Sequence, residues 1–314
     1  MSNITAIDWC AFRSKKSLNH LALSVSKLFE AEDDCKVANL NRGWNGYEST
    51  YGVSIRGKRV GFIASGGIQQ RDWSQVNLTG DAIPHIPNAA ARLTDAIDGA
   101  KGQLKRVDLA LTVSDRSVTV QTVLAAYNSG GFRCAQVNPS LQTILPGDPV
   151  EGTTVYIGKR TQPKFVRAYE KGYEMLKQWN NVLSADEPPL RPEDVPMFGM
   201  PPLADIFRVE LELKIPADQF PLEVLERSDS YFAGAYPYLS SLVDSNPQIF
   251  VLTPQRKAEM DLDQALAHIR KQWGPTLFTA LAVHHGDFMA VWDKVVGAKH
   301  SESLIERGVM FADA

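Results

Sequence analysis

The 314-residue chain has little cysteine, no long hydrophobic run and no excess of positive charge. Its three cysteines, Cys10, Cys35 and Cys134, are widely spaced and form no Cys-x-x-Cys pair, so neither a disulfide framework nor a zinc site is indicated. No stretch approaches the roughly 18 uncharged apolar residues of a membrane span, and residues 1–11 lack the features of a secretion signal. We therefore expect a cytoplasmic protein with no membrane partner.

The formal net charge of −3 argues against a surface of uniformly positive potential, which is the usual sign of nucleic-acid binding. The cations are unevenly distributed, however, because residues 159–171 contain many of them and a single acid, Glu170. These cations are Lys159, Arg160, Lys164, Arg167 and Lys171. A local basic strip can bind phosphates, so we take Lys159, Arg160 and Lys164 as candidate DNA contacts.

Alternating and helical patterns along the chain predict an α+β protein with a largely antiparallel sheet and flanking helices. Strands are expected at 4–12, 51–55, 60–62, 104–113, 153–158, 165–171 and 206–214, and helices at 18–29, 88–97 and 119–127. Beyond residue 218 the pattern is mainly helical, with two runs, 262–273 and 276–283, on either side of Gly274-Pro275. We therefore expect a sheet domain at 1–214, including a Pro-rich loop at 182–205, and a helical C-terminal region at 215–314.

Glycine pairs do not indicate a nucleotide cofactor. Gly66-Gly67 and Gly130-Gly131 lack the preceding strand, the spacing and the lysine of a phosphate-binding loop. Both pairs are expected to form turns.

Three of the expected strands gather charged side chains, and one of them a tyrosine, on one face, because successive residues of a strand point to opposite faces of the sheet. These side chains are Arg106 and Asp108 in the first strand, Arg167, Tyr169 and Lys171 in the second, and Arg208, Glu210, Glu212 and Lys214 in the third. If the strands are neighbours, their polar faces form one surface that carries carboxylates, a tyrosine and cations.

Such a surface has the parts of a phosphodiester-cleaving site. A phenol with an ordinary pKa of about 10 is a poor nucleophile at neutral pH, and a nearby Arg, Lys or divalent cation favours its reactive anion. A metal held by carboxylate oxygens can offset the charge of the attacked phosphate. Alternatively, the polar face of an alternating strand is simply solvated, and its charges form cross-strand ion pairs. The patterns alone leave both interpretations open.

The segment Arg167-Ala168-Tyr169-Glu170-Lys171-Gly172-Tyr173-Glu174 follows an Arg-x-Tyr-x-Lys-x-x-Glu pattern. It resembles the nucleophile motif of rolling-circle replication initiators from small staphylococcal-type plasmids and filamentous phages of Gram-negative bacteria. Further blocks match in the same order: Ile7-Asp8-Trp9, Asn77-Leu78-Thr79-Gly80, Arg106-Val107-Asp108-Leu109-Ala110, Tyr156-Ile157-Gly158-Lys159-Arg160 and Arg208-Val209-Glu210-Leu211. Together they span most of residues 7–214, and we expect a filamentous phage source rather than a plasmid.

The resemblance implies a role for Tyr169, which would attack one strand of the origin, form a 5′-phosphotyrosyl bond and free a 3′-hydroxyl. Arg167 and Lys171 would then hold the scissile phosphate. The implied enzyme is a nicking and closing endonuclease of the bacterial cytoplasm. Its implied partners are double-stranded origin DNA, single-stranded DNA, a host helicase and a host polymerase, and a homodimer is compatible with this role.

The resemblance also implies that nicking depends on Mg²⁺ or Mn²⁺. Asp108 and Glu210 would be metal ligands, and Glu174 would be a further ligand or a base. One position departs from the pattern, since relatives often carry a second acid where this chain has Thr112. Glu212 lies on the same face as Glu210 and is either a substitute ligand or a partner of Lys214.

Two other functions fit the same residues. The first is a non-catalytic DNA-binding regulator built on the same sheet. The second is a hydrolase that uses Asp108 and Glu210 as acid and base, with Tyr169 in a structural role.

Overall fold

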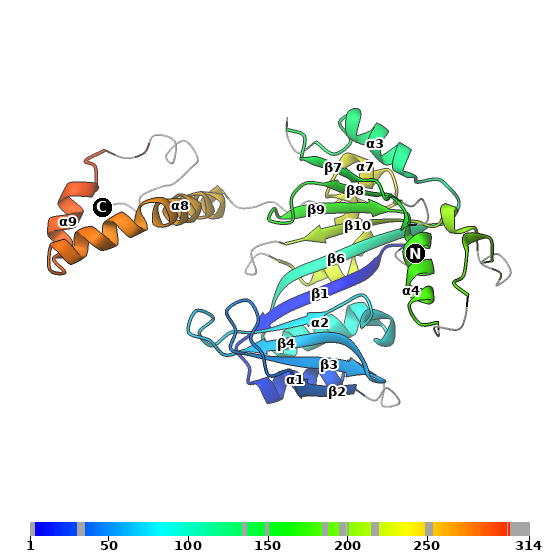
Figure 1. Ribbon diagram of the computed structural model, residues 1–314, viewed down its shortest axis with the longest axis horizontal. Coiled ribbons are helices and arrows are strands. Elements are labelled where there is room, and N and C mark those ends of the chain that lie inside the picture. The colour runs from blue at the N-terminus through cyan, green and yellow to red at the C-terminus, as the bar shows by residue number, and fades with distance from the viewer. Residues whose placement is uncertain are drawn as a thin grey trace. The chain divides into compact units, whose positions relative to one another are not determined.

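The computed structural model (Figure 1) describes residues 4–29, 35–133, 137–147, 151–183, 188–194, 199, 201–214, 220–248, 254–299 and 301. Cys134 and residues 184–187, 195–198 and 200 of the Pro-rich loop expected at 182–205 therefore lie outside the described residues. The chain divides into two compact units, 1–249 and 250–314. This division lies beyond residue 214, where the sequence places the end of the sheet domain.

The first unit contains a single antiparallel sheet, in which the described residues form ten strands in the order β2-β3-β4-β5-β1-β6-β10-β9-β8-β7 (Figure 1). The strands are β1 (Ala6–Ser14), β2 (Cys35–Asn39), β3 (Ser49–Ile55), β4 (Lys58–Ser65), β5 (Ser74–Leu78), β6 (Gln103–Val113), β7 (Leu141–Ile144), β8 (Thr154–Ile157), β9 (Lys164–Tyr169) and β10 (Phe207–Leu213). All the strands expected from the sequence are present, and the α+β class is confirmed. The interior of the sheet is made by β1, β6 and β10, which come from distant parts of the chain.

Helices of the first unit bury their apolar positions against the sheet. They are α1 (Leu18–Ser26), α2 (Ala89–Gly99), α3 (Val120–Asn128), α4 (Lys171–Asn180), α5 (Glu223–Glu226), α6 (Ser228–Ala233) and α7 (Pro237–Ser240), with short 3-10 turns at η1 (Ile83–His85) and η4 (Leu203–Asp205). Leu21 of α1, Leu93 of α2 and Val123 of α3 are fully buried. The strands that these helices contact include β2 and β4 for α1, β1 for α2, and β8 and β9 for α3.

Helix α6 belongs to the first unit, where it binds the two residues directly before β1. The Asp229 carboxylate accepts hydrogen bonds from the backbone N–H of Ile4 at 2.9 Å and of Thr5 at 2.7 Å. It also accepts one from the Thr5 hydroxyl at 2.6 Å. Residues 220–248 are therefore part of the sheet unit, although their pattern is helical.

Helix α4 corrects the expected strand 165–171, which ends at Tyr169. The apolar positions after Lys171 follow a helical period, and Leu176 packs with Leu203 and Ile206 in a small buried cluster. The N–H of Gly172 donates to Ile206 O at 3.1 Å, which turns the chain away from the sheet. Lys171 is therefore the first residue of a helix and not part of a strand face.

The second unit, considered by itself, contains α8 (Pro254–Val283) and α9 (Phe288–Val295). Gly274-Pro275 does not separate two helices, because Pro275 lies inside α8. A proline removes a single N–H from the helical ladder, and here the helix continues through it. None of the helices that the structure describes is long and apolar enough to cross a membrane.

Candidate functional site

The polar face of β6, β10 and β9 carries the candidate site. Across β10 and β9, Arg208 pairs with Tyr169 and Glu210 pairs with Arg167. Across β10 and β6, Glu212 pairs with Asp108. Directly paired residues of antiparallel strands point to the same face, so the polar faces of the three strands form one surface.

Tyr169 lies at one end of this surface, as the last residue of β9, and is 5% exposed. Its hydroxyl donates a hydrogen bond to Glu210 Oε1 at 2.6 Å. The Arg167 guanidinium lies 4.0 Å from the centre of the tyrosine ring, and the Lys171 ammonium lies 5.8 Å from it. Burial, reinforced by the Glu210 charge, raises the pKa of the Tyr169 phenol well above its usual range. The phenol is thus protonated and aimed at a carboxylate.

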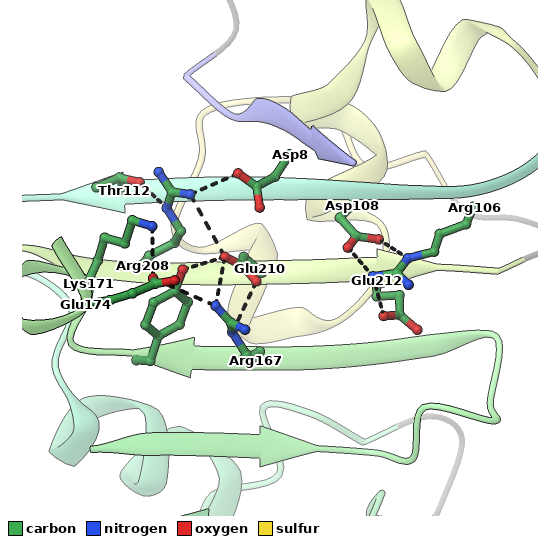
Figure 2. A network of polar contacts seen from close by, with 11 residues as sticks. Asp8, Arg106, Asp108, Thr112, Arg167, Lys171, Glu174, Arg208, Glu210 and Glu212 are labelled. Atoms are coloured by element: carbon green, nitrogen blue, oxygen red, sulfur yellow. Dashed lines mark hydrogen bonds and ion pairs between the residues drawn. The ribbon is translucent and has the colours of Figure 1, made fainter. Parts of the chain in front are cut away.

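Glu210 links the tyrosine to two cations. Arg167 Nε lies 3.2 Å from Glu210 Oε2, and Arg208 Nη1 lies 3.9 Å from Glu210 Oε1 (Figure 2). Burial raises the pKa of Glu210 above its ordinary value, although Arg167 opposes this shift. Glu210 is therefore a carboxylate that can take up a proton more readily than an exposed glutamate.

Lys171 and Glu174, both on α4, complete the site from the helix side. Lys171 Nζ donates to Glu174 Oε2 at 2.8 Å, and Arg167 Nη2 lies 3.9 Å from the same oxygen (Figure 2). Burial favours the neutral acid, but the hydrogen bond and charge of Lys171 bring the pKa of Glu174 below its ordinary value. The structure thus brings together Arg167, Tyr169 and Lys171 with Glu174 and Glu210.

Arg208 and Asp8 also belong to the site, although neither was among the expected site residues. Arg208 Nη1 donates to Asp8 Oδ1 at 2.9 Å, and Arg208 Nε donates to Thr112 Oγ1 at 2.9 Å (Figure 2). Asp8 is the extra residue of a β-bulge, because Ile7 pairs with Leu109 and Trp9 pairs with Asp108. A bulge redirects a side chain relative to regular alternation. Both residues lie in blocks that resemble the initiators, and this was the available signal.

Asp108 belongs to a separate cluster further along β6. Its two carboxylate oxygens accept hydrogen bonds from Arg106 Nε at 2.8 Å and Arg106 Nη2 at 2.5 Å (Figure 2). Arg106 Nη2 also lies 2.8 Å from Glu212 Oε2, and Lys214 Nζ lies 2.5 Å from Glu212 Oε1. Burial raises the pKa of Asp108 to about 6, although the bonds from Arg106 lower it.

Of the expected metal ligands, Asp108 and Glu210 line one cavity, whereas Glu174 is not among its lining residues. Asp108 and Glu210 are not directly opposite each other, because Glu210 pairs with Ala110 on β6, whereas Asp108 pairs with Glu212. In the part of the chain that the structure describes, no group of three or more His, Cys, Asp and Glu side chains could hold a metal ion. Arg167 and Arg208 stand beside Glu210, where a divalent cation would have to bind.

The three candidate DNA contacts lie in or beside the connection between β8 and β9. Lys159 and Lys164 line a cavity of 640 Å³ together with Tyr236. Lys164 Nζ donates to Ala235 O at 3.0 Å, so this lysine also holds the chain after α6. Arg160 lines a different cavity, on the polar face of the sheet.

Comparison with known proteins shows which family this chain belongs to. Residues 102–296, more than half of the chain, match the model of a family described as replication initiation factor. The chain belongs to this family. It is therefore a replication initiator, and the family match includes β6, β9, β10 and α4.

A solved structure supports the fold assignment of this family member. The rolling-circle replication initiator protein from Geobacillus stearothermophilus is 15% identical, with a TM-score of 0.50, over 73% of this chain and 83% of that chain. At this identity the likeness shows the fold alone. No curated protein matches the chain.

Proposed function

We propose that this replication initiator acts in rolling-circle replication by nicking and rejoining one strand of the origin through a phosphotyrosyl bond on Tyr169. The observation that carries the proposal is the 2.6 Å hydrogen bond from the Tyr169 hydroxyl to Glu210, surrounded by cations. A nucleophile in contact with its base and with phosphate-binding groups is the arrangement that covalent catalysis requires.

The charges around Tyr169 balance before DNA binds. The cations Arg167, Lys171 and Arg208 face the carboxylates Asp8, Glu174 and Glu210. A phosphodiester adds one negative charge, and a proton on Glu210 removes one. The raised pKa of Glu210 therefore suits it to accept the proton from the tyrosine when the phosphate is present.

The reaction exchanges one phosphodiester bond for another. Tyr169 Oη attacks phosphorus while its proton passes to Glu210, and the bond from phosphorus to the 3′-oxygen breaks. The 3′-oxygen takes up a proton from solvent, and the 5′-phosphate stays on the tyrosine. Arg167, Lys171 and Arg208 stabilise the negative charge that builds on the phosphate oxygens. Rejoining is the reverse reaction, with a 3′-hydroxyl as nucleophile.

Dependence on Mg²⁺ or Mn²⁺ stays a prediction, and none of these steps uses a metal. The predicted ligands Asp108, Glu210 and Glu174 do not fit a shared ion as they are placed. Recruitment of a host helicase and polymerase, a homodimer and a filamentous phage source likewise stay predictions.

The test is incubation of the protein with supercoiled DNA carrying the origin, with and without Mg²⁺ or Mn²⁺, followed by denaturing electrophoresis. We expect a covalent protein-DNA adduct that disappears in Tyr169→Phe and persists in the matched control Tyr173→Phe. Nicking that continues unchanged in Tyr169→Phe would contradict the proposed nucleophile. Tight origin binding without nicking would support the regulator instead, and cleavage without an adduct would support the hydrolase.

A further inference from the structure

A second cavity opens on the polar face of the sheet, beside the Tyr169 site. Its volume is 250 Å³, and Arg167 and Glu210, which contact Tyr169, also line it. Because the two sites share these side chains, a group bound in the cavity lies next to a phosphate bound at Tyr169. This volume is below that of the usual pocket for a drug-sized ligand, roughly 300 to 1,000 Å³, and suits a single planar ring system.

Flat surfaces form part of the cavity wall. The Arg106 guanidinium lies 4.6 Å from the centre of the Trp9 ring, and the Arg160 guanidinium lies 5.4 Å from the centre of the Phe165 ring. All four side chains line the cavity. Aromatic rings and guanidinium planes are the surfaces on which unstacked nucleobases pack.

Hydrogen-bond acceptors are concentrated in the same cavity. Asp108 and Glu212 are 7% and 5% exposed, and they lie directly opposite each other on β6 and β10. Arg106 and Lys214 bind some of their lone pairs, but an ionised carboxylate offers about four acceptor positions. A ligand in this cavity can therefore donate hydrogen bonds to the remaining acceptor positions of Asp108 and Glu212.

Trp9, which also lines the cavity, carries a hydrogen-bond donor and therefore calls for an acceptor on the ligand. Its indole Nε1 is buried, and the described residues provide no hydrogen-bond partner for it. A buried donor without an acceptor is unfavourable, and a bound acceptor would satisfy it.

We propose that this cavity binds one unpaired nucleobase next to the scissile phosphate and selects guanine through Asp108, Glu212 and Trp9. Guanine presents adjacent N1–H and N2–H donors to a carboxylate and an O6 acceptor to the Trp9 indole. Thymine would turn carbonyl oxygens towards the carboxylates, and cytosine and adenine present an unprotonated ring nitrogen beside their amino group. The base must be unpaired because base pairing occupies these donors.

The proposal rests on the proposed function in taking single-stranded DNA as the ligand and Tyr169 as the residue that faces the scissile phosphate, but its test does not require nicking. The full chain with Tyr169→Phe is used to select sequences by binding from a pool of randomised single-stranded DNA. We expect one position of the selected motif to favour guanine over other bases by on the order of tenfold to a hundredfold. Adding Glu212→Gln should abolish the preference at that position and leave the other positions unchanged, whereas the control Glu223→Gln should change neither.

A second measurement uses the selected oligonucleotide with inosine in place of that guanine, which removes only the 2-amino group. The Tyr169→Phe protein should bind the inosine oligonucleotide several-fold more weakly than the guanine oligonucleotide. The variant that also carries Glu212→Gln should bind the two oligonucleotides equally. Trp9→Phe, which keeps an aromatic ring but lacks the N–H donor, should also weaken the guanine preference. Thermal melting verifies that each variant is folded.

Two outcomes overturn the proposal. One is a guanine preference that is the same in Glu212→Gln and Trp9→Phe as in the parent. The other is a folded parent protein that selects no base at any position. If the protein with Tyr169 formed no covalent adduct with origin DNA, the proposed nicking would be contradicted, but this binding result would be unaffected.

Discussion

The Tyr169 phenol is held in its neutral form by the carboxylate that we propose removes its proton. Burial and Glu210 together raise the pKa of the phenol, so little of the reactive phenolate is present in the ligand-free site. A phosphate that draws Arg167 away from Glu210 would raise the pKa of Glu210 further, because the charge of Arg167 lowers it in the ligand-free site. Glu210 is thus expected to take the phenol proton more readily when DNA is bound.

Glu210→Gln tests the base directly. Glutamine keeps the shape and can still accept a hydrogen bond from Tyr169, but it cannot take up the proton. Loss of a general base typically costs about 10²- to 10⁴-fold in rate, and we expect a loss of this size in adduct formation. DNA binding should remain. The control is Glu193→Gln, because the Glu193 side chain is 68% exposed. An unchanged rate of adduct formation in Glu210→Gln would show that another group is the base.

The pH dependence of nicking should also report on Glu210. Only the ionised carboxylate acts as base, so activity is lost as the pH falls through its pKa. Burial raises that pKa and the Asp8 charge raises it further, so the loss should begin at a higher pH than for an exposed glutamate. Asp8→Asn should move the acid limb of the pH-rate profile to lower pH. A profile that is identical in the two proteins would mean that another group controls it.

At the scale of secondary structure, the bulge in β1 is the element that completes the site. It turns Asp8 towards Arg208, and Gly80 lies against this aspartate. A Cβ atom at Gly80 would lie 3.0 Å from the Asp8 carbonyl oxygen and 3.1 Å from Asp8 Oδ1. A side chain at position 80 must therefore displace Asp8.

Gly80→Ala is expected to slow nicking through this displacement. Asp8 must shift by a few tenths of an ångström, and since misplacing a catalytic group by about 1 Å can cost up to about 10²-fold in rate, we expect a smaller loss than this. An added methyl group typically costs about 1–3 kcal/mol of stability. Adduct formation and thermal unfolding measure the two effects separately. Gly99→Ala is the matched control, because a Cβ at Gly99 meets nothing within 4 Å. Equal nicking rates in the two variants would show that the position of Asp8 does not matter.

Alternation in the sequence predicted the strands and polar faces of β6, β9 and β10, because period-two patterns depend only on local geometry. It could not predict register, and register is what separates Asp108 from Glu210. The bulge at Asp8 interrupts alternation, so that residue was missed. Strands β2, β5 and β7 were also not predicted, since each has at most five residues and little pattern. Helix α4 was not predicted, and its first residue, Lys171, was assigned to the preceding strand because it continues the alternation of β9.

At the scale of the whole molecule, a net charge of −3 must be reconciled with DNA binding. The site cations near Tyr169 are balanced by carboxylates, so phosphates further along the strand need other cations. Lys159 is exposed and lines the 640 Å³ cavity beside the β8-β9 connection. We propose that it contacts the DNA backbone.

The salt dependence of DNA affinity tests this role. Each phosphate contact contributes about 0.9 to the slope of log affinity against log salt for duplex DNA, so Lys159→Ala should reduce the slope by about one. Lys58→Ala should leave it unchanged, because the Lys58 ammonium is already paired with Asp81 at 2.8 Å. Equal slopes for Lys159→Ala and the parent protein would exclude a phosphate contact at Lys159.

The order of the strands also has a consequence in time. Asp8 on β1 and Arg208 on β10 are 200 residues apart in the chain, yet they meet in the interior of the sheet. A ribosome adds about 5–20 residues per second, so Arg208 is synthesised on the order of 10–40 s after Asp8. Until β10 is made, Tyr169 lacks Glu210 as well. If the proposed function holds, an unfinished chain therefore cannot cut DNA, and a product broken off before β10 would be an inert fragment rather than an unregulated nuclease.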